Sequence, residues 1–386
     1  MNFGINNNEI ETLSKCSVCN SSNSYVISEV FTKEVCFFST SICKECGFVY
    51  RNIRPKFDWL VNCWRERDEH QKSLGIIPID SEVENNRIQR YKSLEFFLSS
   101  IVKNKSILDI GSGTGSGLKS FKEAGWKVTG IEADASRARY GINKYGIETI
   151  VDVIENINVD KKYPVVTSIH SLEHFYDPEK KLELMASFVE DGGYLYIEVP
   201  DALTHVLDWS DNFFLGHLSN FSENNLGLLG VKFGLNPIFR TFPKSKHNGV
   251  KNLGILFKKE KSEVLKYPIE NIKKNILNIV KAYHSNRVSE KDKLKIYLPE
   301  INDLSIGYKG ESKQSKFDIV SSNCLKKVSK NEYFVRDCSN SLSNLVEKIK
   351  SLNPLMLRNL LNTKPISFFR KLDKNFLEIQ YTKFRV

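Results

Sequence analysis

Two pairs of cysteines near the start of the chain have the spacing of a metal site. Cys16 and Cys19 form one C-x-x-C pair, Cys43 and Cys46 form a second, and 23 residues separate the pairs. Each short turn can direct two sulfurs towards one point, and four thiolates complete a tetrahedral zinc site that is structural because no coordination position stays open. Two disulfides are the alternative, but we expect no secretory signal in the polar N-terminal residues, and disulfides are rare without export. The spacing predicts a zinc ribbon.

A glycine-rich turn indicates a second site. The segment "SILDIGSGTGSGLKSF" contains a short apolar run that ends at Asp109, followed by Gly111, Gly113 and Gly115. The dinucleotide fingerprint G-x-G-x-x-G fails in both registers, which favours a ligand without a pyrophosphate. Glu132 lies 21 residues after Gly111, where a carboxylate can accept hydrogen bonds from both ribose hydroxyls. S-adenosylmethionine fits this pattern, because its ammonium and sulfonium groups suit a nearby carboxylate.

Histidines supply the candidates for acid–base chemistry. If the ligand is the methyl donor S-adenosylmethionine, methyl transfer to an alcohol would require removal of the hydroxyl proton, for which histidine is the usual base near pH 7. We expect His217 to be the base or a substrate contact, with His170 as the alternative. Glu173 and His174 either assist or only hydrogen-bond the turn before "YDP". "HSLEH" also matches an inverted zinc-protease motif, but that motif requires both histidines on one helix face, and this segment lies at a strand-to-loop junction.

The elements around the glycines form a β-α-β unit. "KSILDI" is typical of a buried parallel strand, "GLKSFKEAG" of a helix that ends at Gly125, and "WKVTGIE" of a second strand. Before them, apolar residues recur at helical spacing and predict an amphipathic helix that packs on the sheet: Ile88, Tyr91, Leu94, Phe97, Leu98 and Ile101. The alternation of strands and helices predicts a doubly wound α/β domain whose ligands bind at the carboxyl ends of the strands.

These motifs resemble the core of class I S-adenosylmethionine-dependent methyltransferases. "ILDIGSGTG" and "VTGIEAD" are similar to the first two motifs of that family, and "YPVVTSIHSLEHFYDPEKKLELMASFVEDGGYLYIEVPD" is similar to its fourth and fifth strands. The resemblance implies that Asp109 and the three glycines line the cofactor, that Glu132 binds the ribose, and that Asp152 meets the adenine. It also leaves open a divalent metal at the "HSLEH" turn, as in some quinone-pathway O-methyltransferases, with His170 at the position of their first acid.

Cysteine pairs followed by this core resemble the sugar C-methyltransferases of surface-polysaccharide pathways. The corresponding segment "FFLGHLSNFS" keeps His217, but Phe214 and Gly216 replace the tyrosine and glutamate of that group. The resemblance therefore implies a nucleotide-linked or glycan sugar as the acceptor, methylated on oxygen rather than carbon. An RNA methyltransferase and a non-catalytic cofactor-binding scaffold are the alternatives. Against RNA, the segment after the fourth strand lacks an Asn/Asp-Pro-Pro-aromatic motif, and no Pro-Cys occurs in the chain.

Length and charge complete the predicted organisation of the 386-residue chain. We expect a zinc ribbon over residues 1–62, a helical linker over 63–100, the Rossmann-like methyltransferase core over 101–260 and a basic, mixed and partly helical region over 261–386. The net charge of +10 arises in that last region, which has 25 basic and 13 acidic residues. A basic excess confined to one end does not indicate a nucleic-acid groove. With no apolar run near ~18 residues, we expect no membrane span and a cytoplasmic protein.

The last region gives weaker local signals. The residues after Pro268 have helical spacing, "SLSNLVEKIKSL" and "ISFFRKLDKNFLEI" also favour helices, and "KFDIV" and "EYFV" favour strands. The oligomeric state is not predicted.

Overall fold

The computed structural model describes most of the first 260 residues and several strands beyond them. The described residues are 7–32, 35–60, 81–158, 160–202, 217–241, 252–260, 296–297, 304–309, 314–320, 333–337, 368–370 and 376–380. Within these ranges, no helix combines the length and the apolar composition that a membrane crossing needs.

The chain forms two compact units, and each is assembled from separate stretches of sequence. The first contains Met1–Ile77, Ala202–Ser222 and Ile269–Val386, and the second contains Pro78–Asp201 and Glu223–Pro268. We call them the cysteine unit and the glycine-turn unit. The predicted boundaries at 62, 100 and 260 stay predictions, whereas the placement of Ala202–Ser222 in the cysteine unit was not anticipated.

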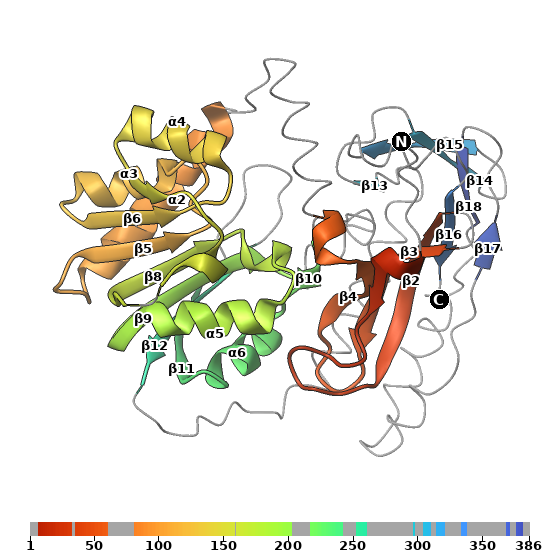
Figure 1. Cartoon of the computed structure of the whole chain (residues 1–386), viewed down its shortest axis with the longest axis horizontal. Helices are drawn as coiled ribbons and strands as arrows, with labels where there is room; N and C mark the ends of the chain where they lie inside the picture. Colours follow the sequence, from red (N-terminus) through yellow and green to blue (C-terminus); the bar gives the residue numbers. More distant parts are fainter. Residues whose placement is uncertain are drawn as a thin grey trace. The chain divides into compact units, whose positions relative to one another are not determined.

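The glycine-turn unit contains a seven-stranded sheet in the order β11-β12-β9-β8-β5-β6-β7 (Figure 1). Its strands are β5 (Ser106–Ile110), β6 (Lys127–Ile131), β7 (Glu148–Ile150), β8 (Tyr163–Ile169), β9 (Val189–Pro200), β11 (Leu235–Thr241) and β12 (Asn252–Lys259). The five neighbouring strands β9, β8, β5, β6 and β7 are parallel to one another. Strand β12 is antiparallel to both of its neighbours, β9 and β11. Because the chain order reverses beside β5, the fold is Rossmann-like, as predicted.

Helices cover both faces of this sheet: α2 (Ser81–Ser99), α3 (Ser116–Glu123), α4 (Ala135–Tyr145), α5 (Pro178–Phe188) and α6 (Glu223–Val231). The right-handed crossovers of parallel strands place α3 and α4 on one face and α5 on the other. The predicted amphipathic helix is α2, and its Tyr91 and Leu98 join the buried cluster that Phe121 and Trp126 extend. Ile101 is 39% exposed and lies beyond the end of the helix.

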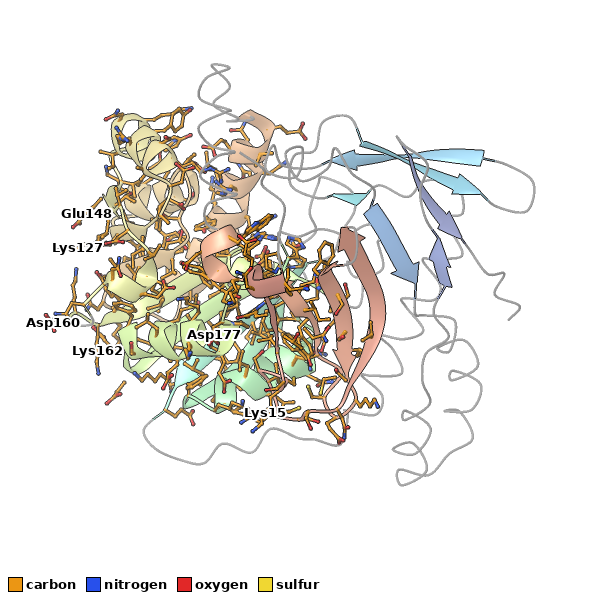
Figure 2. All side chains as sticks on the ribbon, turned by 45° about the vertical axis from the view of Figure 1, so that its right-hand side comes forward. Lys15, Lys127, Glu148, Asp160, Lys162 and Asp177 are labelled. Carbon is orange, nitrogen blue, oxygen red and sulfur yellow. The ribbon has the colours of Figure 1, made fainter. Side chains whose placement is uncertain are left out.

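The two edges of the sheet differ in chemistry. Lys127, Glu148, Asp160 and Lys162 lie at or just before the amino ends of β6, β7 and β8, and their charged side chains point into solvent at one edge (Figure 2). The glycine turn and the other predicted ligand-binding residues of this unit lie at the opposite, carboxyl ends of the strands. A parallel sheet therefore gathers the candidate site at a single edge.

The cysteine unit contains a second sheet, in the order β1-β4-β3-β2-β16-β17. Its strands are β1 (Ile10–Thr12), β2 (Ser24–Thr32), β3 (Val35–Cys43), β4 (Val49–Pro55), β16 (Tyr333–Asp337) and β17 (Phe368–Arg370), and β10 (Ser219–Asn220) pairs with β4 outside that path. The β2–β3 hairpin lies between the two cysteine pairs, where the β-branched and aromatic residues predict strands.

A four-stranded sheet in the order β13-β15-β14-β18 lies further along the chain. It consists of β13 (Ile296–Tyr297), β14 (Leu304–Lys309), β15 (Gln314–Val320) and β18 (Phe376–Gln380). The predicted strands "KFDIV" and "EYFV" are confirmed as β15 and β16. The helix predicted at "ISFFRKLDKNFLEI" is wrong, because β17 and β18 pair there with β16 and β14. Short apolar runs do not distinguish the two states without their pairing partners. The helices predicted after Pro268 and at 341–352 lie outside the described residues.

Candidate functional site

Three glycines make the turn between β5 and α3. Gly111, Gly113 and Gly115 have φ values of 76°, 58° and 67°, a left-handed backbone that costs any other L-residue about 1–2 kcal/mol. At Gly111 the space is also occupied, because an added Cβ would lie 2.1 Å from the Ser171 hydroxyl. The spacing of the motif is therefore set by both the backbone conformation and the close approach of the loop after β8.

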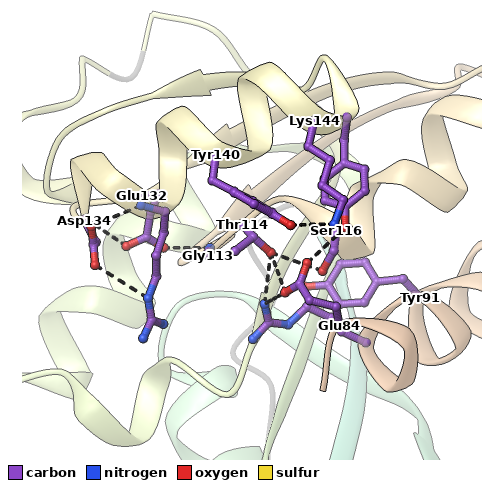
Figure 3. Close-up of polar contacts among 12 residues, drawn as sticks. Glu84, Tyr91, Gly113, Thr114, Ser116, Glu132, Asp134, Tyr140 and Lys144 are labelled. Carbon is purple, nitrogen blue, oxygen red and sulfur yellow. Dashed lines mark hydrogen bonds and ion pairs between the residues drawn. The ribbon is translucent and has the colours of Figure 1, made fainter. Parts of the chain in front are cut away.

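Glu132 follows β6 and fixes the turn from the neighbouring strand. Its carboxylate accepts a hydrogen bond from the Gly113 backbone N–H at 2.6 Å and one from the Asp134 N–H at 2.9 Å (Figure 3). The side chain is only half-buried, so part of it stays accessible to a ligand at the carboxyl ends of the strands. An acidic group in this position can accept from ribose hydroxyls while it holds the glycine backbone in place.

Asp109 lies beneath the turn and is 1% exposed. Its two carboxylate oxygens accept hydrogen bonds from the Tyr91 hydroxyl at 2.9 Å and the Thr167 hydroxyl at 2.7 Å. Burial raises the pKa of Asp109 to about 6, although the two hydroxyls and Arg87 oppose that shift. The acid of the motif is thus engaged by protein groups, and its predicted contact with the cofactor stays a prediction.

Helix α2 brings residues to the turn that sequence reasoning missed. The Thr114 hydroxyl donates to Glu84 at 2.7 Å, and Arg87 lies 3.4 Å from both of these side chains (Figure 3). An added Cβ at Gly113 would meet the Arg87 guanidinium at 3.2 Å. Glu84, Arg87 and Tyr91 share one face at i, i+3 and i+7, and that spacing of polar groups was the available signal.

Asp152 follows β7, at the same edge of the sheet as Glu132. Its carboxylate accepts from the Val153 N–H at 2.7 Å and from the Asn156 side chain at 2.8 Å. The nearby Val151 and Val153 are 44% and 39% exposed. The position fits the predicted adenine contact, which stays a prediction.

His170 follows β8 in a strained conformation and lies between two carboxylates. Its φ is 54°, and its N–H donates to the Glu198 carbonyl at 2.8 Å. The imidazole Nδ1 lies 3.4 Å from Glu173, and Nε2 lies 3.3 Å from Glu198, which also binds Arg90 at 3.0 Å. Burial lowers the pKa of His170, but the two carboxylates outweigh it and raise that pKa to about 9.

This arrangement bears on the choice of base. A histidine that is protonated at pH 7 and has a carboxylate beside each ring nitrogen is a poor proton acceptor. The geometry therefore favours a positioning role for His170. His174, in the same turn, lies 3.8 Å from Glu173. His217 is 9% exposed and belongs to the cysteine unit, next to β10. Its role as base stays a prediction.

The four predicted zinc ligands lie together in the cysteine unit. Cys16, Cys19, Cys43 and Cys46 form no disulfide, and their sulfurs all lie within 4.8 Å of one another. The Cys16–Cys46 and Cys19–Cys43 sulfur distances are 3.7 and 3.5 Å, well beyond a disulfide bond of about 2.05 Å. Zn–S bonds of about 2.3 Å in a tetrahedron place sulfurs about 3.8 Å apart, so the set fits zinc.

The two cysteine turns have the same backbone geometry. The Asn20 N–H donates to the Cys16 carbonyl at 2.9 Å, and the Gly47 N–H donates to the Cys43 carbonyl at 2.9 Å. Asn20 and Gly47 follow the second cysteine of their pairs and have left-handed φ values of 62° and 73°. Sequence reasoning missed Asn20, although asparagine is the residue after glycine that best tolerates this conformation.

Comparison with known proteins identifies the domain that carries the glycine turn. Residues 84–238 match the family model described as "Methyltransferase domain". The central part of the chain is therefore a methyltransferase domain of the S-adenosylmethionine-dependent class. Its match begins within α2, the helix that supplies the contacts to the glycine turn.

The similar proteins cover only part of this chain. Protein 235L of Invertebrate iridescent virus 6, named as a methyltransferase, is 31% identical over 143 residues, which are 36% of this chain and 48% of the relative. The ubiquinone biosynthesis O-methyltransferase of Stutzerimonas stutzeri is 29% identical over 148 residues, which are 36% of this chain and 59% of the relative. The chain thus spans about half the length of the curated relatives it matches.

Among solved structures, the Burkholderia thailandensis 1,6-didemethyltoxoflavin-N1-methyltransferase is similar to this chain. It has a TM-score of 0.44 and 14% identity, and the match covers 55% of this chain and 96% of the other.

Proposed function

We propose that this protein transfers the methyl group of S-adenosylmethionine to a hydroxyl oxygen of a nucleotide-linked or glycan sugar. The observation that carries the cofactor assignment is the link between Glu132 and the Gly113 N–H at the carboxyl ends of β5 and β6. S-adenosylmethionine supplies a methyl group that its sulfonium already activates. The protein's residues then have to bind the cofactor and the acceptor, orient them towards each other and exclude water.

The glycine-turn unit contains the groups that would hold this cofactor. The left-handed glycines keep the turn free of side chains, so that an amino-acid moiety can lie close to the backbone. Glu132 would accept from the ribose hydroxyls, and Asp152 lies after the next strand for the adenine. Alignment of this kind can contribute about 7–11 kcal/mol to a displacement reaction.

The acceptor is assigned to oxygen on two grounds. The segment around His217 lacks the tyrosine and glutamate of the sugar C-methyltransferases it resembles, and several curated relatives are O-methyltransferases. His217 would remove the hydroxyl proton as the methyl group arrives. With His170 held between two carboxylates, His217 is the better candidate for that step.

A structural zinc ion is part of the proposal. The sulfur distances and the matched turns support tetrahedral coordination by the four cysteines. The ion would stabilise the cysteine unit and would take no part in the transfer, since all four positions are occupied.

A second acceptor class has a specific observation in its favour. Several relatives act in ubiquinone biosynthesis, so a hydroxyl on a small molecule that is not a sugar is the competing acceptor. Purified protein with methyl-labelled S-adenosylmethionine would be incubated with separate fractions of glycan, nucleotide-sugar, lipid extract and RNA. Label in glycan or nucleotide-sugar supports the proposal, label in the lipid extract favours the second class, and label in RNA contradicts both.

Calorimetry with the cofactor tests the ribose assignment. Replacing Glu132 by alanine removes two charged hydrogen-bond acceptors, and we expect the affinity to fall at least ~30-fold. Glu132→Gln should lose less, because one acceptor oxygen stays in place. Glu148→Ala, at the exposed amino end of β7, is the control and should bind normally. Unchanged affinity in Glu132→Ala would remove Glu132 from the cofactor site.

A further inference from the structure

One segment of the chain lies within the methyltransferase domain by sequence but belongs to the cysteine unit. The domain match runs from 84 to 238, whereas Ala202–Ser222 is part of the unit that holds the four cysteines. The segment follows β9 directly. In open α/β sheets, connections after the carboxyl ends of strands carry ligand contacts.

Backbone pairing attaches this segment to the strand next to the second cysteine turn. In β10, Ser219 pairs with Tyr50 and Asn220 with Val49 of β4. The Arg51 N–H also donates to the Leu218 carbonyl at 3.0 Å. The same side of β4 pairs with β1 further along, so β1 and β10 together cover that edge of the strand.

The other side of β4 is connected to the cysteines. Val49 and Tyr50 pair with Ile42 and Ser41 of β3, immediately before Cys43. The Cys43 N–H donates to the Phe48 carbonyl at 2.8 Å. Val49 and Tyr50 of β4 therefore pair with β3 on one side and with β10 on the other. A shift in the backbone of the second cysteine turn is passed to β10 through this one strand.

Side-chain packing reinforces this connection. Phe48 lies directly after the second cysteine turn, and its ring lies 5.1 Å from that of Phe221. Both rings are 0% exposed. The Phe221 carbonyl in turn accepts from the Ala202 N–H at 2.8 Å, which joins the two described ends of the segment.

We propose that metal binding by the four cysteines fixes the conformation of residues 217–222, so that this segment folds together with the rest of the cysteine unit. The inference rests on the zinc site of the proposed function. It gives the ribbon a defined task, which is to position the segment that carries His217. Thermodynamic linkage then requires that loosening the segment lowers the metal affinity by the same factor by which bound metal stabilises the segment.

Hydrogen exchange on the purified full-length protein, before and after removal of metal by a chelator, tests the proposal. The amides of Arg51 and residues 218–221 are expected to exchange at least ~10-fold faster without metal, while those of β5 and β8 change less than about twofold. Cofactor affinity, measured by calorimetry, should also change less than about twofold. Unchanged exchange at 218–221 after metal loss overturns the proposal, as does a chain that binds no metal.

A variant pair tests the reverse direction of the coupling. Phe221→Ala leaves all four cysteines in place but opens a cavity beside Phe48. We expect it to weaken zinc binding, measured at equilibrium by competition with a chromogenic chelator, about tenfold. Phe188→Ala removes a similarly buried ring from the glycine-turn unit and should bind zinc with normal affinity. Equal zinc affinities in the two variants contradict the coupling. Since neither measurement uses methyl transfer, failure of the proposed acceptor leaves this result intact.

Discussion

The two units reach a defined structure by different means. The glycine-turn unit has a parallel sheet with helices on both faces and a continuous buried cluster around Leu118, Phe121 and Trp126. In the cysteine unit, four thiols converge between two turns that share one backbone hydrogen bond and one left-handed residue. The first unit surrounds its site with packed side chains, whereas the proposed zinc ion would stabilise the second. The comparison predicts different responses to metal, to added volume and to pH.

Metal removal should have the largest effect, and it should be confined to one unit. Structural zinc contributes on the order of 10–16 kcal/mol in small fingers, so a chelator or the pair Cys43→Ser and Cys46→Ser should unfold the first sixty residues. The glycine-turn unit should still bind S-adenosylmethionine in calorimetry. Elemental analysis should find about one zinc ion per chain before treatment. Loss of cofactor binding along with the metal would show that the two units do not fold independently.

Added volume in the glycine turn should have the next largest effect. Gly111→Ala combines an unfavourable φ with a clash against Ser171, and we expect a loss of about 2–4 kcal/mol in the free energy of unfolding, measured with urea.

Gly125→Ala is the matched control for that variant. Gly125 has a φ of 82°, but nothing lies within 4 Å of its added Cβ, so only the conformational cost of about 1 kcal/mol applies. Equal losses in the two variants would mean that the approach of Ser171 does not matter.

A change of pH should give the smallest effect, again within the glycine-turn unit. The folded pKa of His170 is raised to about 9, above its ordinary value of 6.5. Its contribution to stability is therefore complete below pH 6.5 and is lost as the pH rises through 9. Since the side chain is 32% exposed, we expect about 1–2 kcal/mol, reduced by solvent screening.

Urea unfolding between pH 6 and 10 measures this loss, and His170→Gln should flatten the curve. His174→Gln, in the same turn but 3.8 Å from Glu173, is the control and should keep the pH dependence. An NMR titration reports the His170 pKa directly, and a value near 6.5 would contradict the pairing of His170 with Glu173 and Glu198.

Parts of the candidate site were predictable because their causes are local. The run "SILDI", the alternating glycines and the following "GLKSF" determine a strand, a left-handed turn and a helix within sixteen residues. The C-x-x-C spacing likewise fixes the two cysteine turns. The interpretation of Tyr91 as an apolar residue of an amphipathic helix was incomplete, because its ring is buried in the core while its hydroxyl donates to Asp109.

By itself, the sequence determined the α/β fold of the domain, the glycine turn, the acid after the second strand and the four cysteines that meet. Each follows from periodicity or from spacing over a few residues. Only the tertiary structure decided that Glu84 and Arg87 reach the turn, that Glu173 and Glu198 flank His170, and that β10 joins the cysteine unit. These contacts join residues distant in sequence, or depend on how a turn packs against the sheet, and no local pattern encodes that packing.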